Sequence, residues 1–121
     1  MAYINFIMGW KNQDLQVLKE ICDPGLKVFF VDSDNQQIEY DYHQFINLLD
    51  IRFQNVQDWQ FDIINRYNRY DEELILSNVT RENSQQELIE PLAFCIFTFK
   101  KSKEPKLIRM YMETKLNQQK Y

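Results

Sequence analysis

The stretch EPLAFCIFTFKKSKEPKLIRMYMETK, residues 90–115, contains two runs of strand-forming residues joined by a charged connection. The first run, residues 92–99, is almost entirely apolar, which is typical of a central strand covered on both faces. The second run, residues 107–115, alternates between the two sides of a strand. One side carries Ile108, Met110 and Met112, and the other carries Arg109, Tyr111 and Glu113. The stretch therefore predicts one long antiparallel hairpin, against which the rest of the chain packs.

The composition indicates a folded chain with no general affinity for nucleic acid. The 121 residues are 45% hydrophobic and include only two glycines and three prolines, which argues against disorder and predicts one domain over residues 1–121. A net charge of −4 opposes binding to nucleic acid. Four lysines fall within residues 100–106 together with Glu104, and we interpret them as a solvated turn. We expect no nucleic-acid partner.

The few cysteine and histidine residues do not form a metal-binding or redox motif. Cys22 and Cys95 are far apart in the sequence, and His43 is the only histidine, so we expect no metal and no cofactor. Residues 1–10 are apolar, but they lack a basic leading segment and charged residues follow within 11–14. They therefore predict neither a signal peptide nor a membrane span. A cytoplasmic protein with reduced thiols is the expectation.

The beginning of the chain predicts two short helices. Residues 2–11 have the apolar spacing of the first, although Gly9 weakens it. Asn12 is a suitable N-cap for the second helix, with Asp14 in its first turn. Apolar residues then recur at helical spacing, and the run DPG at residues 23–25 predicts the end of this helix.

A small hairpin and a longer helix follow. Residues 27–31 predict a strand, residues 32–35 a turn of side chains that hydrogen-bond their own backbone, and residues 37–40 a return strand. Asp41 is placed to cap the next helix. The apolar stripe of that helix consists of Phe45, Leu48, Leu49, Phe53 and Val56.

The rest of the chain has the pattern of strands. Residues 59–70 and 74–81 predict two strands before the hairpin, with a mobile polar loop at residues 82–87, and residues 117–121 form a polar tail. Strands that follow one another without crossover helices pair antiparallel. The order predicts an α+β domain in which three N-terminal helices cover one face of a mostly antiparallel sheet.

Three segments of the chain resemble a known superfamily. Residues 10–15, WKNQDL, are similar to its aromatic residue followed by Asp-Leu at the junction of the first two helices. Residues 22–30, CDPGLKVFF, are similar to its passage into the first strand, and residues 42–53 to the helix that closes the mouth of its cone. The chain thus resembles the nuclear transport factor 2-like superfamily, which includes ketosteroid isomerase, scytalone dehydratase and the SnoaL-type polyketide cyclases. The resemblance implies a curved sheet that forms a cone, a cystatin-like α+β roll.

The resemblance allows the family chemistry to be tested residue by residue. The tyrosine, the base and the oxyanion donor of ketosteroid isomerase would fall at Phe6, near Phe30 (with Asp32 two residues on) and near Cys95. Phenylalanine has no hydroxyl, and a thiol cannot replace a protonated carboxylic acid, so isomerase activity is not expected. The His–Asp pair of a scytalone dehydratase would have to use His43.

Other catalytic arrangements each have a structural alternative. Cys95 and His43 could form a nucleophile pair, but Cys95 lies within an apolar run and is more simply a core residue. Asp32 or Asp34 could act as a general base, and either could equally well form the turn in which it lies.

A polar couple inside the cone is a further alternative. Asp62 and Arg109 lie on neighbouring predicted strands, but alternation favours the outer face of the sheet for both. Alternation predicts the same outer face for Arg66, Arg69 and Tyr111. The catalytic candidates are Asp32, His43 and Asp62.

Aromatic and sulfur-containing side chains could line a ligand pocket at the wide end of the cone or simply fill its core. They are Phe6, Trp10, Phe30, Phe53, Trp59, Phe61, Cys95, Phe97 and Met110. Three functions are therefore compared. The first is binding of an apolar or aromatic small molecule, and the second is a SnoaL-like or dehydratase-like lyase or isomerase acting beside a carbonyl. The third is a homodimeric interaction module that pairs through the outer sheet face at Arg109, Tyr111 and Glu113.

Overall fold

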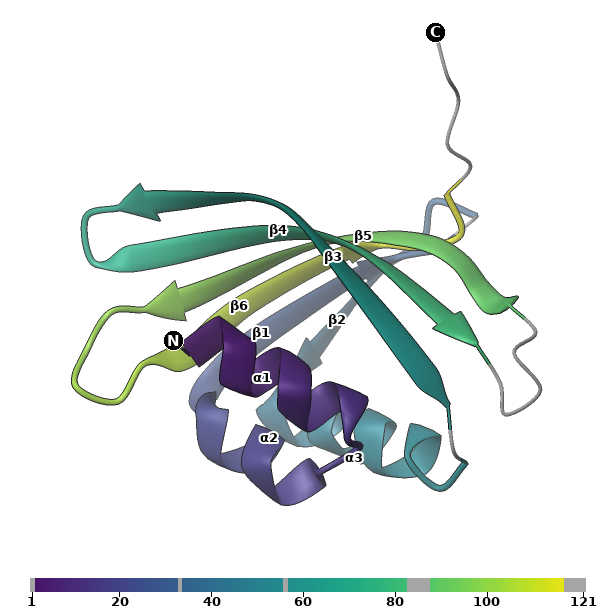
Figure 1. Ribbon diagram of the computed structural model, residues 1–121, viewed down its shortest axis with the longest axis horizontal. Helices are drawn as coiled ribbons and strands as arrows, with labels where there is room; N and C mark the ends of the chain where they lie inside the picture. Colours follow the sequence, from purple (N-terminus) through teal and green to yellow (C-terminus); the bar gives the residue numbers. More distant parts are fainter. Residues whose placement is uncertain (1, 33, 56, 83–87, 117–121) are drawn as a thin grey trace, which may run out of the picture.

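The computed structural model describes residues 2–32, 34–55, 57–82 and 88–116, and it contains three helices on the concave side of a curved six-stranded sheet (Figure 1). The helices are α1 (Ala2–Lys11), α2 (Leu15–Ile21) and α3 (Tyr42–Arg52). The strands are β1 (Cys22–Val31), β2 (Gln37–Asp41), β3 (Asp58–Arg69), β4 (Glu72–Glu82), β5 (Leu88–Lys100) and β6 (Lys106–Glu113). These elements confirm the predicted α+β class. The predictions for Val56, for most of the loop at residues 82–87 and for the tail at residues 117–121 lie outside the described residues.

The predicted hairpin, β5 and β6, lies in the interior of the sheet. The strand order is β2-β1-β6-β5-β4-β3, so both hairpin strands have a neighbour on each side. Strands β3 to β6 pair antiparallel in sequence order, as predicted. In contrast, β1 and β6 pair parallel, with Phe29 opposite Tyr111. This parallel pair forms because β2 turns back along one edge of β1 and leaves the other edge of β1 to β6.

The junction of α1 and α2 has a different cap from the predicted one. The N-cap of α2 is Asp14, whose carboxylate accepts a hydrogen bond from the N–H of Val17 at 3.3 Å. Asn12 was predicted as the cap, but its N–H donates to the carbonyl of Met8 at 2.9 Å and so continues the last turn of α1. The prediction was wrong because the chain changes direction one residue later, at Gln13, which has a positive φ of 53°.

Helix α2 ends directly before the run DPG at residues 23–25, as predicted, and the run itself lies inside β1. The helix ends before it, with Cys22 as the C-cap. The carboxylate of Asp23 accepts a hydrogen bond from the N–H of Gly25 at 2.8 Å, and the register of β1 against β6 shifts across this run. Cys22 and Leu26, which flank the run, are both buried. The run is therefore a local irregularity in a strand that packs on the core both before and after it.

The N-terminus of α3 is formed as predicted. The carboxylate of Asp41 accepts a hydrogen bond from the N–H of Gln44, and the side chain of Gln44 accepts one from the N–H of Asp41, each at 2.9 Å. This reciprocal pair is a capping box. Phe45 and Leu49 of the predicted stripe have no accessible surface, so α3 buries this face in the core.

A β-bulge in β3 changes the side to which its second half points. The register of β3 against β4 shifts between Ile63 and Asn65. Beyond the shift, Arg66 lies opposite the core residue Ile75, and its guanidinium lies over the ring of Tyr3 in α1 at 4.9 Å. The prediction that Arg66 lies on the outer face was therefore wrong, because an inserted residue breaks the alternation of side chains.

Candidate functional site

Most of the side chains that were predicted to line a pocket form the centre of the core. Phe6, Phe97 and Met110 have no accessible surface, and Trp10 is 1% exposed. The ring of Phe6 lies 5.7 Å from that of Trp10 and 5.4 Å from that of Phe97, measured between centroids. A void large enough for water would give its lining side chains accessible surface, so these groups fill the space between α1 and the sheet. The other members of the set are Cys95, Trp59 and Phe30, which are buried, and Phe53 and Phe61, which are half-buried.

Phe30, a predicted pocket residue, and Asp32, a catalytic candidate, both line an open cleft between α3 and the β1–β2 hairpin. The cleft has a volume of about 200 Å³, and its lining includes Phe30, Leu48 and Asp32. The carboxylate of Asp32 accepts hydrogen bonds from the N–H groups of Asp34 and Gln36, each at 2.9 Å. This carboxylate therefore holds the turn between the two strands, which is the structural role weighed against catalysis.

The two thiols are protonated core groups. Burial raises the pKa of the Cys22 thiol to about 12, against a smaller opposing effect of Lys106, and burial also raises the pKa of the Cys95 thiol. Since the thiolate is the nucleophilic form, neither group is suited to nucleophilic catalysis at neutral pH. His43 is exposed on α3, with its ring 5.4 Å from that of Tyr42. Within the described ranges, no three His, Cys, Asp or Glu side chains are grouped so that they could hold a metal ion.

No described helix covers the convex side of the sheet (Figure 1). This side carries a row of apolar side chains. We call this surface the outer sheet face. Its half-buried apolar members are Phe29, Leu74, Leu76, Phe94, Ile96 and Tyr111. A depression of about 320 Å³ on it is lined by Phe29, Arg69, Leu74, Ile96, Thr98, Arg109 and Tyr111. Asp62 is exposed and in register with Asn78, whereas Arg109 is in register with Thr98. The two residues, which were weighed as a polar couple, therefore lie in two different cross-strand rows.

Charged groups are paired with one another on the outer sheet face. Glu72 accepts hydrogen bonds from Arg69 at 2.7 Å and from Arg109 at 3.3 Å. The hydrogen bond from Arg69 is the main reason why the pKa of Glu72 is below its usual value, and the charge of Arg109 lowers this pKa further. The Tyr111 hydroxyl donates to the Glu113 carboxylate at 2.5 Å, and this bond raises the pKa of Tyr111. The structure therefore brings the predicted group Arg109, Tyr111 and Glu113 onto one apolar surface.

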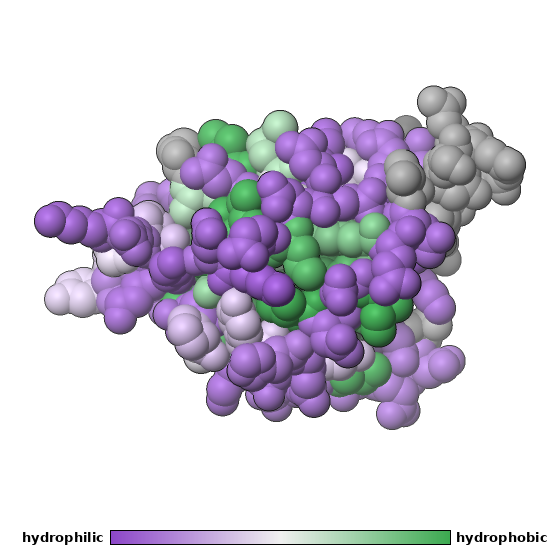
Figure 2. Space-filling model, turned by 90° about the horizontal axis from the view of Figure 1, so that it is seen from below, coloured by the Kyte–Doolittle hydropathy of each residue, from purple (hydrophilic) through white to green (hydrophobic). Residues whose placement is uncertain are grey.

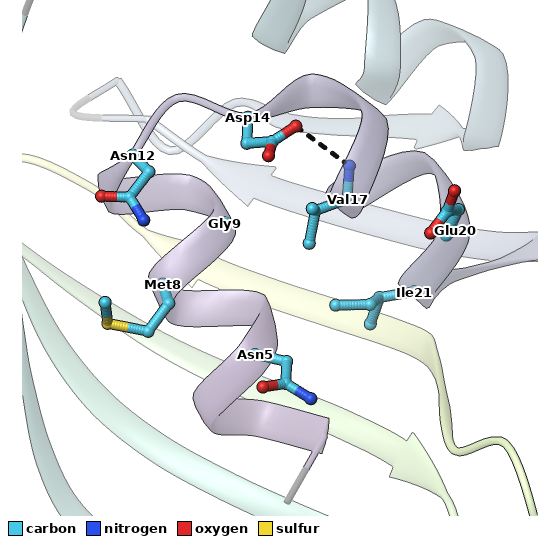
Figure 3. A pocket seen from close by; sticks show the side chains of 8 residues that line it. All are labelled: Asn5, Met8, Gly9, Asn12, Asp14, Val17, Glu20 and Ile21. Carbon is cyan, nitrogen blue, oxygen red and sulfur yellow. Dashed lines mark hydrogen bonds between the residues drawn. The ribbon is translucent and has the colours of Figure 1, made fainter.

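A groove between α1 and α2 was not predicted from the sequence (Figure 3). We call it the helix groove. It has a volume of about 420 Å³ and is lined by Asn5, Met8, Gly9, Asn12, Asp14, Val17, Glu20 and Ile21. Seen from the helix side, the molecule shows an apolar area surrounded by polar residues (Figure 2). Gly9 was the one signal in the sequence, because a glycine inside a helix often marks close approach of another element.

Solved structures resemble this chain, whereas no protein-family model and no curated protein sequence matches it. A calcium/calmodulin-dependent protein kinase type II association domain, provisionally assigned, from Thiobacillus denitrificans has a TM-score of 0.75 at 6% identity, over 95% of this chain and 93% of its own. A provisionally assigned dehydratase of the nuclear transport factor 2-like family from Streptomyces avermitilis has a TM-score of 0.70 at 15% identity, over 96% and 92%. A ketosteroid isomerase-like protein from Erwinia carotovora atroseptica has a TM-score of 0.68 at 11% identity, over 96% and 92%.

The chain has the nuclear transport factor 2-like fold. Sequence identities of this size establish the fold and leave activity to be argued from the site. In this chain, the positions at which the resemblance places isomerase groups are Phe6, Phe30 and Cys95, and all three are buried. None of these side chains supplies the hydroxyl or carboxyl group that the reaction needs.

None of the described helices is long and apolar enough to cross a membrane.

Proposed function

We propose that this chain is a homodimeric interaction module that pairs through the outer sheet face. The observation that carries the proposal is the apolar surface of Phe29, Leu74, Ile96 and Tyr111, which no described helix covers. A sheet normally buries its apolar faces against another layer. A second copy of the same face would supply that layer, because a two-fold interface places the same patch on both subunits.

The size of the face supports pairing. Six strands spaced about 4.8 Å apart, with an average length of about 30 Å, give a flat footprint of roughly 860 Å². A standard interface buries roughly 800 Å² on each partner. The paired charges at Glu72 add polar groups beside the apolar centre, as in the rims of known interfaces. The protein from Thiobacillus denitrificans to which the chain is similar is described as an association domain, which is in keeping with pairing.

The oligomeric state tests the proposal directly. We expect native mass spectrometry to give twice the 14.8 kDa subunit mass. Tyr111→Glu should give a folded monomer, because it places a second carboxylate beside Glu113 at the centre of the interface. The matched control is Tyr70→Glu, since Tyr70 is 98% exposed at the β3–β4 turn. A wild-type monomer at tens of micromolar, or a folded Tyr111→Glu protein that remains dimeric, would refute this interface.

Binding of an apolar or aromatic small molecule is the second candidate. The cleft beside Phe30 and Leu48 supports it, because the half-buried Leu48 and the exposed Ile38 present apolar surface there, between α3 and the β1–β2 hairpin. We propose no catalytic role for this chain. The same native spectra test the candidate: a bound mass that is lost on denaturation, and that Leu48→Asp abolishes, supports a ligand at the cleft. A bound mass that survives in Leu48→Asp, or none at all, contradicts it.

We propose a cytoplasmic location for the protein. Cys22 and Cys95 are both free thiols, and such thiols suit a reducing compartment. Fractionation of cells that express the tagged chain tests the location. Recovery in a secreted or periplasmic fraction would contradict it.

A further inference from the structure

The helix groove is formed by two helices that meet at one end. Residues 12–14 join α1 to α2, and the helices approach closely at Gly9, where an added Cβ would lie 3.0 Å from Cγ1 of Val17 and 3.2 Å from Cδ2 of Leu18. Asn5 of α1 and Ile21 of α2 line the groove farther from this junction (Figure 3). The groove therefore lies between two helices that approach closely at Gly9 and that each bury residues in the core, Phe6 and Trp10 from α1 and Leu18 from α2.

The lining of the groove combines apolar surface with negative charge. Met8 is 50% exposed, and Val17 and Ile21 are half-buried. Asp14 and Glu20 are the two charged members among the eight lining residues, and both are acidic. Asp14 keeps one carboxylate oxygen on the N–H of Val17, so its charge is held at the groove by the helix cap.

We propose that the helix groove binds a basic amphipathic helix of a partner protein. An amphipathic helix places apolar anchors at every third or fourth residue, and these would contact Met8, Val17 and Ile21. Lysine or arginine side chains flanking the anchors would face Asp14 and Glu20, so the charges of the two partners are complementary. A helix of acidic character would meet two carboxylates of like charge and be rejected.

The helix groove lies on the opposite side of the molecule from the outer sheet face (Figure 1). The inference therefore does not depend on the proposed dimer, and the monomeric Tyr111→Glu protein should bind the helix as well as the wild type does. In a dimer paired through the sheets, both grooves would face outward. One assembly would then present two equivalent sites.

Two synthetic peptides test the groove with the whole chain. Each is a helix of about sixteen residues with leucines at i, i+4, i+7 and i+11, flanked in one peptide by lysines and in the other by glutamates. Fluorescence anisotropy of the labelled peptides measures affinity. We expect the lysine peptide to bind at least about tenfold more tightly than the glutamate peptide, with an affinity that falls as salt is raised.

Matched variants separate the groove from general attraction to an acidic protein. Met8→Lys should weaken binding of the lysine peptide by roughly tenfold or more, whereas Ile64→Lys, at a side chain of similar exposure (52%) outside the groove, should leave it unchanged. Glu20→Lys should lower the affinity for the lysine peptide by several-fold. Glu39→Lys makes the same change of charge on β2, outside the groove, and should leave this affinity unchanged. Equal binding of the two peptides, no binding of either, or equal losses in Glu20→Lys and Glu39→Lys would overturn the proposal.

Discussion

Replacing Phe6 by alanine should destabilise the protein strongly and open an apolar cavity in its core. Phe6 has no accessible surface, and its ring contacts those of Trp10, Phe97 and Phe99 with centroids 5.4 to 6.0 Å away. Burying such a side chain contributes roughly 1.5–3 kcal/mol of transfer free energy. A residual cavity of about 100 Å³, at about 24 cal/mol per Å³, adds roughly 2 kcal/mol. Phe6→Ala should therefore lower the free energy of unfolding by roughly 4–5 kcal/mol.

Urea denaturation followed by tryptophan fluorescence measures this change, because Trp10 and Trp59 lie together in the same core at 5.2 Å between centroids. The cavity should also bind a small aromatic molecule. Benzene at ten times its dissociation constant would restore about 1.4 kcal/mol to the variant and nothing to the wild type. Phe6→Leu, with an expected loss of roughly 1–2 kcal/mol, keeps the test available if the alanine variant does not fold.

The control is Tyr70→Ala, which removes a side chain of similar size from a position that is 98% exposed and should change stability by less than about 0.5 kcal/mol. A loss below about 2 kcal/mol in Phe6→Ala, with no response to benzene, would refute the conclusion that aromatic rings fill the cone. Stabilisation of the wild type by benzene would refute it as well, because an occupied core has no room for the ligand.

Two further predictions concern the helix cap and the paired charges. Asp41→Ala should lower the free energy of unfolding by about 1 kcal/mol, because it removes the capping box, whereas Asp41→Asn should lower it far less. Urea denaturation measures both changes, and similar losses in the two variants would contradict the role of the cap. The pKa of Glu72 is lowered in the folded state, so its stabilisation is present above the ordinary glutamate pKa and is lost as pH falls through the folded value. The free energy of unfolding of Glu72→Gln should therefore be lower than that of the wild type by at most about 1 kcal/mol near pH 7, and this difference should vanish at acid pH. A difference that stays constant with pH would count against the Arg69 and Arg109 pairs.

Local patterns in the sequence were sufficient for most elements of the fold. The hairpin of β5 and β6, the cap at Asp41 and the division into helices and strands all follow from residue periodicity and capping chemistry, which act over a few positions. Asn12 was misjudged because its role depends on where α1 ends. Arg66 was misjudged because a bulge is a tertiary feature that leaves the apolar pattern nearly intact.

The surfaces were harder to predict than the elements. The residues Arg109, Tyr111 and Glu113 could be assigned to one side of a strand by alternation alone. In contrast, the apolar side chains around Tyr111 on the outer sheet face come from three other strands, β1, β4 and β5, and the register between β1 and β6 brings Phe29 beside it. The helix groove depends on the crossing of two helices at Gly9, which periodicity within either helix does not contain.

The parallel pairing of β1 with β6 imposes an order on folding during synthesis. Phe29 emerges from the ribosome long before Tyr111, its neighbour in the sheet. Until β5 and β6 have been made, Phe6 in α1 also lacks Phe97 and Phe99, so the early helices have no core to pack against. Contacts between such distant segments slow folding and leave apolar surface open in the interval. Phe6 and Phe29 therefore stay without these partners until β5 and β6 have been synthesised.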